Sequence, residues 1–396
     1  MIIVGHVGYT SSEGFKVSFQ EESGGSNKQY TSKGLKEFIH YMESKGKHVI
    51  VSVGGKLSHI EWKYIDLNKL KKIVEEYGFN GINFDLSDSD IPKNQKNVSI
   101  AAQKISALIN SIKGHKPFNS NFWLTFSPNW TYIVAPLDKN NKDNIYKTHH
   151  YVDLINKIGI NNVNYIWLNT YSEQATVGVL GPYRDKGGEY TKVTPADGYS
   201  KFLTSLGWAL TTQDGYSANL SKYRDEPLKI PADKLVFMIP ATEGASSHGM
   251  IYVLSKKGIE ETVTALKRNK ASFGGFAIYS LDFDATNIVD GMLSAGYSHE
   301  PWATTEAIAD IKLPPIASHI VNNPYQQKQT KPKQESTINT GIIEYPNDIG
   351  SYSSNTLVEY QDTRYKCVSD QVVKLCNDNS YIPNGLHGYL AWEELE

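Results

Sequence analysis

Short apolar runs alternate with amphipathic helical patterns along most of the chain, and this alternation restricts the fold more than any other feature. A typical run is "HVIVSVGG" (48–55), which is almost continuously apolar and ends in two glycines. Before it, Leu35, Phe38, Ile39 and Met42 follow the i, i+3, i+4, i+7 spacing of a helix with one buried face. Continuous apolar strands separated by helices indicate a parallel sheet that is buried on both faces.

The strand-like runs occur throughout the first 300 residues. They lie at 1–7, 15–19, 48–55, 81–86, 122–128, 163–171, 234–240 and 274–281. Two further helical faces consist of Leu67, Leu70, Ile73 and Val74, and of Ile105, Leu108, Ile109 and Ile112. Eight β/α units in about 300 residues predict an α/β fold of the (β/α)8 TIM-barrel type. An open doubly wound sheet is the alternative.

The bulk composition excludes several classes of partner. The net charge is −2 and the pI is near 6.6, so nothing favours nucleic acid or an anionic membrane. No apolar run approaches the roughly 18 residues that a membrane span needs. Histidines and cysteines lack the spacing of a zinc site, and we expect neither a metal nor a cofactor.

The composition changes after residue 313. Residues 314–342 are rich in Pro, Gln, Lys and Asn and predict an extended linker. The predicted domains are therefore a barrel at 1–313, the linker, and a compact β-rich module at 343–396. The chain's two cysteines, Cys367 and Cys376, both lie in this module and predict a disulfide, which favours an oxidising compartment.

Polar residues gather where the fourth predicted strand ends, in "GFNGINFDLSDSDIP" (78–92). Asn83, Asp85 and Ser87 share one side of the strand because side chains alternate with period two. Function in a β/α barrel lies at the carboxyl ends of the strands. These residues predict either a ligand site or a hydrogen-bonded polar layer inside the barrel.

Two segments carry a resemblance to a known family. "SVGG" (52–55) and "FNGINFDLS" (79–87) resemble the signature segments of glycoside hydrolase family 18, the chitinases. Later strand ends, "LTFSPN", "WLNTYS", "IPAT" and "FAIYSLDFD", resemble that family in the same order. The resemblance covers most of residues 1–295 and implies a chitinase-like barrel.

The family's second segment reads Asp-Gly-x-Asp-x-Asp-x-Glu. The resemblance places its three Asp on Asn80, Asn83 and Asp85, and its Glu on Ser87. In the family the Glu protonates the glycosidic oxygen, while the third Asp stabilises the substrate's own acetamide as it attacks. A serine hydroxyl cannot supply that proton at neutral pH. The resemblance therefore implies that no catalytic set is intact, and that the protein is a chitinase-like pseudoenzyme.

The remaining residues can still hold a sugar. The resemblance implies substrate contacts from Asp85, Asn83 and Tyr171 by hydrogen bonding, and from Tyr279, which replaces the family's Trp, by stacking. Trp130 follows a strand end and predicts either a ligand-facing ring or loop packing.

The C-terminal module resembles the chitin-binding modules of carbohydrate-binding family 5/12. The matching frame is "VEYQDTRYKC", "CN", "YIP" and "AWEEL" within residues 348–395. The resemblance implies that Tyr381 and Tyr389 stack on a chitin chain.

We therefore expect a protein that binds chitin or a GlcNAc-containing glycan and does not hydrolyse it appreciably. One alternative is an active chitinase that uses Asp88 or Asp90 as its acid; the other interpretation of these two residues is that they are solvated loop residues with turn-forming side chains. Another is a structural or targeting subunit of a secreted or toxin-like assembly, with a protein partner. The N-terminus has no recognisable signal peptide, but the disulfide favours an extracellular location.

Overall fold

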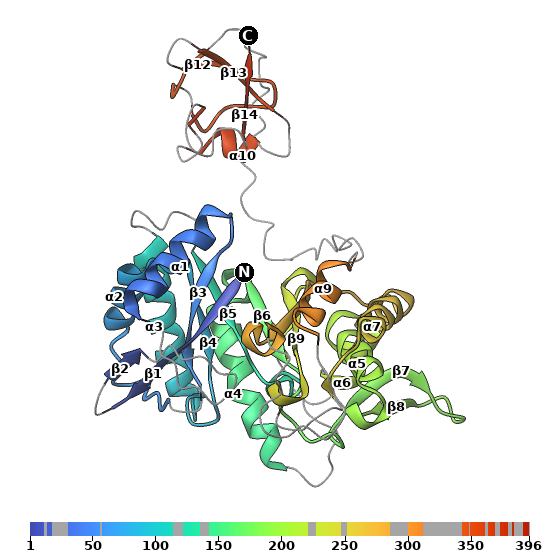
Figure 1. The fold of residues 1–396 in the computed structure, drawn as a ribbon. Coiled ribbons are helices and arrows are strands. Elements are labelled where there is room, and N and C mark those ends of the chain that lie inside the picture. Colours follow the sequence, from blue (N-terminus) through green and yellow to red (C-terminus); the bar gives the residue numbers. More distant parts are fainter. Residues whose placement is uncertain are drawn as a thin grey trace, which may run out of the picture. The chain divides into compact units, whose positions relative to one another are not determined.

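The protein is represented by a computed structural model that divides into two compact units, residues 1–318 and 319–396 (Figure 1). The described residues are 1–11, 14–17, 31–55, 58–113, 122–134, 142–220, 227–246, 252–285, 300–311 and 343–395, without 348, 361–362, 369–372, 379–381 and 384–390. The predicted linker at 314–342 lies outside the described residues. The two units are described one at a time.

One sheet organises the first unit. Its strands are β1 (Ile2–Thr10), β2 (Gly14–Val17), β3 (Val49–Gly54), β4 (Gly81–Asp85), β5 (Trp123–Phe126), β6 (Tyr165–Asn169), β9 (Leu235–Pro240) and β10 (Gly275–Tyr279). From β1 to β10, neighbouring strands are parallel and follow each other in chain order. A doubly wound sheet would reverse its order at a switch point. The doubly wound alternative is therefore wrong, and the (β/α)8 TIM-barrel class is confirmed.

One predicted member of the parallel series is different. The strand predicted at 15–19 is observed as β2, and it pairs antiparallel with β1 through Val7–Val17 and Thr10–Gly14. Only residues 11–13 separate the two strands, which is too short for a crossover helix but sufficient for a hairpin. β2 thus covers the outer edge of β1, and within the described part of the chain no strand pairing joins β10 to β1 or β2.

Helices connect the strands. They are α1 (Ser32–Ser44), α2 (Leu67–Tyr77), α3 (Gln95–Lys113), α4 (Lys142–Ile158), α5 (Tyr199–Thr211), α6 (Gln213–Asn219), α7 (Lys256–Arg268), α8 (Leu281–Ala285) and α9 (Ala303–Ala309). Short 3-10 helices are η1 (Trp130–Tyr132), η2 (Ile160–Asn162), η3 (Pro195–Asp197), η4 (Ala232–Lys234) and η5 (Glu243–Ala245). The hairpin β7 (Val179–Arg184) and β8 (Tyr190–Val193) forms a separate two-stranded sheet.

Local sequence explains where several helices begin. The side chains of Thr31, Asp66 and Ser255 precede α1, α2 and α7, and each accepts a hydrogen bond from a backbone N–H of the first turn. The predicted apolar face of α3 is buried, and so is that of α2 except for Ile73, which is half-buried. In α1 the predicted face is only partly right, because Leu35 and Ile39 are buried but Phe38 is exposed.

The core lies between the sheet and its helices. All six residues of β3 are buried, as are the first four of β4, which is the pattern of strands covered on both faces. In Figure 1, α1, α2 and α3 lie beside β1, β3 and β4, while α5, α6 and α7 lie towards the other end of the sheet. The carboxyl ends of β3, β4, β5, β6, β9 and β10 are consequently held in fixed register.

The second unit has a four-stranded sheet, in the order β11 (Ile343–Glu344), β12 (Leu357–Tyr360), β13 (Thr363–Cys367) and β14 (Trp392–Leu395). β11 is parallel to β12, and the other pairs are antiparallel. Its small core is largely aromatic and contains Tyr345, Tyr352, Tyr365 and Trp392.

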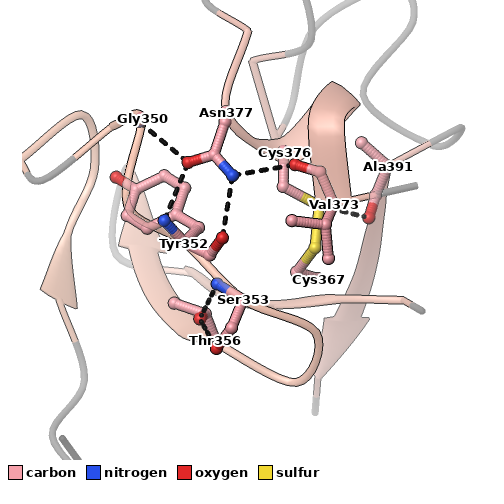
Figure 2. The surroundings of a disulfide bond; sticks show 9 residues. All are labelled: Gly350, Tyr352, Ser353, Thr356, Cys367, Val373, Cys376, Asn377 and Ala391. Atoms are coloured by element: carbon pink, nitrogen blue, oxygen red, sulfur yellow. Dashed lines mark hydrogen bonds between the residues drawn. A yellow bond between two sulfur atoms is a disulfide. The ribbon is translucent and has the colours of Figure 1, made fainter. Parts of the chain in front are cut away.

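A disulfide and one asparagine hold this unit together. Cys367, at the end of β13, is bonded to Cys376, at the end of α10 (Val373–Cys376), and both are buried. Figure 2 shows the next residue, Asn377, among the backbone groups around the disulfide. Its Oδ1 accepts from the N–H groups of Gly350 and Tyr352, and its Nδ2 donates to the carbonyls of Tyr352 and Val373, all at 2.8–2.9 Å.

Candidate functional site

Asp85 is the last residue of β4 and lies at the carboxyl end of the sheet. Its side chain is 38% exposed. The end of β3 approaches it closely, because the N–H of Gly55 donates to the Asp85 carbonyl at 2.9 Å. A Cβ on Gly54 would lie 2.1 Å from that carbonyl oxygen, and Gly54 has a φ of +118°. The "SVGG" segment is thus required for β3 to pass this close to Asp85.

His6, on β1, contacts the Asp85 carboxylate. Its Nε2 lies 3.2 Å from Asp85 Oδ2, and the side chains of both residues are about a third exposed, at 31% and 38%. A Cβ on Gly55 would lie 3.0 Å from the His6 ring, so the second glycine of "SVGG" leaves room for the imidazole. Sequence reasoning missed His6. The only available signal was a polar residue within the apolar run "MIIVGHV".

Asn83 faces the interior rather than a ligand. It is 1% exposed. Its Oδ1 accepts hydrogen bonds from Thr125 at 2.8 Å and Ser127 at 3.0 Å, and its Nδ2 donates to Ser52 at 3.1 Å. The structure therefore contradicts the predicted substrate contact of Asn83. The alternative prediction, a hydrogen-bonded polar layer, is right, because two hydroxyl donors and one acceptor satisfy a neutral amide.

Asn80 lies at the other end of β4, away from the carboxyl ends of the strands. Its Oδ1 accepts from the N–H of Val49, where β3 begins, at 3.0 Å. Its Nδ2 donates to Glu43, near the end of α1, at 2.5 Å. Asn80 therefore joins β3, β4 and α1 and does not reach the site.

Ser87 lies two residues beyond Asp85, in a turn. Its hydroxyl donates to Asp90 Oδ2 at 3.0 Å and lies 2.9 Å from the hydroxyl of Ser89. Asp90 is completely buried, and its Oδ1 accepts from the N–H of Ile60 at 2.6 Å. Burial raises the pKa of Asp90, and hydrogen bonds from Ile60 and Ser87 oppose that rise. Asp90 is thus an internal group that ties this turn to the segment after β3.

Asp88 is exposed and accepts a hydrogen bond from the hydroxyl of Tyr132 in η1. Burial raises the pKa of Tyr132, and the hydrogen bond to Asp88 raises it further. The negative charges of Asp88, Glu173 and Asp85 act in the same direction. Three carboxylates, two from the end of β4 and the turn after it and one from the segment after β6, therefore lie within electrostatic reach of one tyrosine.

Glu173 is the second residue that sequence reasoning missed. It follows the end of β6, and its Oε1 accepts from Asn129 Nδ2 at 2.8 Å and from the Thr131 hydroxyl at 3.0 Å. The signal that could have found it is its place two residues after the strand predicted at 163–171.

Two aromatic residues that the sequence predicts as substrate contacts lie together in the structure. Tyr171, after β6, and Tyr279, at the end of β10, have stacked rings with centroids 6.0 Å apart. Tyr171 is 6% exposed and Tyr279 is half-buried, so Tyr279 presents more of its ring. Both tyrosines lie at the same edge of the sheet as Asp85.

Trp130 has no exposed surface. Its ring packs edge-on against Phe202, with the centroids 5.2 Å apart. The predicted ligand-facing role is therefore wrong, and the alternative of loop packing is right, because η1 turns the side chain inward onto α5. Tyr381 and Tyr389, predicted to stack on chitin, lie outside the described residues.

Neither a metal site nor a membrane span is found in the part of the chain that the structure describes. There, no three His, Cys, Asp or Glu residues are placed to hold a metal ion. None of the described helices is both long enough and apolar enough to cross a bilayer.

Three known proteins similar to this chain are chitinases. No protein-family model matches it. It is 36% identical to Chitinase D of Niallia circulans over 115 residues, which are 26% of this chain and 22% of that protein. It is 23% identical to a chitinase of Enterococcus faecalis over 274 residues, covering 66% of this chain and 67% of that protein. A solved family 18 chitinase from Pseudoalteromonas aurantia aligns with a TM-score of 0.44 and 16% identity, over 71% of this chain and 86% of that one.

The match spans about a fifth of the length of Chitinase D and of a further similar protein, Chitinase Chi52 of Paenibacillus xylanexedens. The first unit of this chain has a parallel α/β sheet in barrel order, and parts of the chain's sequence are similar to chitinases.

Proposed function

We propose that this protein binds chitin or another GlcNAc-containing glycan at the carboxyl ends of its strands and does not hydrolyse it appreciably. The observation that carries the proposal is Ser87, which stands where the family resemblance places the general acid and whose hydroxyl is bonded to the buried Asp90. A serine hydroxyl does not protonate a leaving group at neutral pH, and losing general acid catalysis typically costs a factor of about 100 to 10,000.

Two features at the carboxyl ends of the strands support binding. The Asp85 carboxylate is partly exposed and can accept a hydrogen bond from the N–H of an acetamide. Tyr279 offers a partly exposed ring beside Tyr171, which suits the apolar face of a pyranose. A carboxylate acceptor and an aromatic surface at the same edge of the sheet suit an N-acetylated sugar.

The structure offers less support for hydrolysis by a substitute acid. Asp90 is completely buried and cannot touch a sugar in this conformation. Asp88 is exposed, but its carboxylate accepts the hydroxyl of Tyr132. That carboxylate therefore acts as a hydrogen-bond acceptor for Tyr132, whereas a general acid must donate a proton to the leaving group.

We assign chitin binding also to the module at 343–396, joined to the barrel domain (1–313) by the linker at 314–342. The module's disulfide suits an oxidising, extracellular compartment. Its assignment rests on the sequence resemblance, since Tyr381 and Tyr389 lie outside the described residues.

Two assays test the proposal with the full chain. Chitin beads should retain the protein, and a fluorogenic chitotriose should be cleaved at a rate far below that of an ordinary chitinase. Turnover within about tenfold of such an enzyme would defeat the claim of inactivity. Failure to bind both beads and soluble chitotriose would defeat the claim of binding.

A further inference from the structure

Asp85 is not held by its neighbour on the same face of β4. Asn83 shares that face, but its hydrogen bonds go to Ser52, Thr125 and Ser127 on or beside the flanking strands. Among the described residues, no hydrogen bond joins the side chains of Asn83 and Asp85. A carboxylate at a strand end rotates broadly about χ2 unless another group holds it.

His6 supplies that contact from β1. Its Nε2 is 3.2 Å from Asp85 Oδ2, and both side chains retain about a third of their exposure. The imidazole packs beside Gly55, where a Cβ would come within 3.0 Å of the ring. The end of β3 thus fits around the pair. The contact with His6 fixes one oxygen of the Asp85 carboxylate, and the carboxylate stays open to a ligand.

We propose that His6 is a positioning residue for Asp85, and that recognition of the sugar's acetamide depends on the contact between them. By binding Oδ2, His6 turns Oδ1 of Asp85 towards the N–H of a bound N-acetyl group. A preorganised acceptor avoids the ordering cost that a rotating carboxylate would meet on binding. This inference rests on the proposed function, because it concerns the same site and the same class of ligand.

The test compares two trisaccharides on the full-length protein by calorimetry. Chitotriose carries acetamides, whereas cellotriose has hydroxyl groups in their place and is equally uncharged. The variants are His6→Ala, which removes the contact, and His6→Gln, which keeps an N–H donor of similar reach. His40→Gln, on the exposed side of α1, is the matched control. The second unit is the same in every variant, so a difference in affinity between variants reports on the first unit.

We expect the wild type and His40→Gln to prefer chitotriose. His6→Ala should weaken chitotriose binding by about tenfold, the typical size of one hydrogen bond to a charged group, and leave cellotriose binding unchanged. His6→Gln should recover part of the preference. If His6→Ala keeps the full preference, the inference is overturned while the proposed function stands. If the wild type binds neither sugar, both are overturned.

A second measurement follows ligand binding at His6 in the wild-type protein itself. The imidazole signals of His6 in the labelled wild-type protein, assigned by their loss in His6→Gln, should shift on adding chitotriose and stay in place with cellotriose. Signals that do not move when chitotriose binds would overturn the inference.

Discussion

The Ser87 hydroxyl lies 3.0 Å from Oδ2 of Asp90, a carboxyl group with no exposed surface. Position 87 is therefore part of the internal structure of the turn after β4. A carboxyl group introduced there would meet another one at hydrogen-bonding distance. Two carboxylates in such contact cannot both ionise at low cost.

Replacing Ser87 with Glu should consequently restore little hydrolysis. The new carboxyl group would share a proton with Asp90 or push the turn out of place. The double variant Ser87→Glu/Asp90→Asn removes the repulsion and should be the more active of the two on fluorogenic chitotriose. Strong turnover from Ser87→Glu alone would mean that Asp90 does not constrain position 87.

Asp90 should make the first unit less stable as the pH rises. Its folded-state pKa is raised by burial, so the folded protein holds the proton to a higher pH than the unfolded chain. Its stabilising contribution is complete below the unfolded pKa of about 3.9 and is lost as the pH rises through the folded-state pKa. Asp90→Asn removes this dependence, so the variant's stability relative to wild type should increase with pH above about 4. Urea unfolding across this pH range measures the difference, and a constant difference would contradict the prediction.

Gly54→Ala should be strongly destabilising. The added Cβ would lie 2.1 Å from the Asp85 carbonyl oxygen, and the residue would also have to adopt a φ of +118°. Gly46→Ala is the matched control, because Gly46 has a φ of +67° but no heavy atom within 4 Å of the place that an added methyl group would occupy. We expect the control to cost about 1–2 kcal/mol from its backbone conformation alone, and Gly54→Ala to cost clearly more. Equal melting temperatures for the two variants would argue against the close approach of β3 to Asp85.

Substitutions of Tyr279 and Trp130 should affect different properties, sugar affinity in the first case and protein stability in the second. Tyr279→Ala removes a partly exposed ring and should weaken chitotriose binding by about threefold to tenfold. Trp130→Phe alters a fully buried ring that contacts Phe202, so it should lower the melting temperature without changing sugar affinity. Calorimetric titration and thermal unfolding of both variants provide the check; a loss of affinity in folded Trp130→Phe would contradict this division.

Asn377 should be essential to the second unit. In Asn377→Asp an oxygen replaces Nδ2 and faces the carbonyls of Tyr352 and Val373, so two hydrogen bonds become repulsive contacts. We expect a loss of about 2–4 kcal/mol. Hydrogen exchange of peptides from residues 343–395 should be much faster in this variant, whereas Asn347→Asp, at an exposed position, should match the wild type.

The sequence predicted most of the barrel because the relevant information is local. Strand-length apolar runs and helical spacing specify the elements of the first unit, and their chain order specifies the barrel class. The same reasoning placed β2 in the parallel series, since an apolar run does not encode its direction. Only the short connection at 11–13 indicates a hairpin.

The sequence alone also determined which residues lie at the strand ends: Asp85, Tyr171 and Tyr279 follow from period-two alternation and from where each apolar run stops. The tertiary structure decided which of these side chains meet one another and which are buried. It joined His6 to Asp85 across β3, enclosed Asn83 between hydroxyl groups, turned Trp130 into the core and brought Glu173 beside η1. Contacts of this kind depend on neighbouring strands and on loop geometry, and the pattern within a single segment carries no information about either.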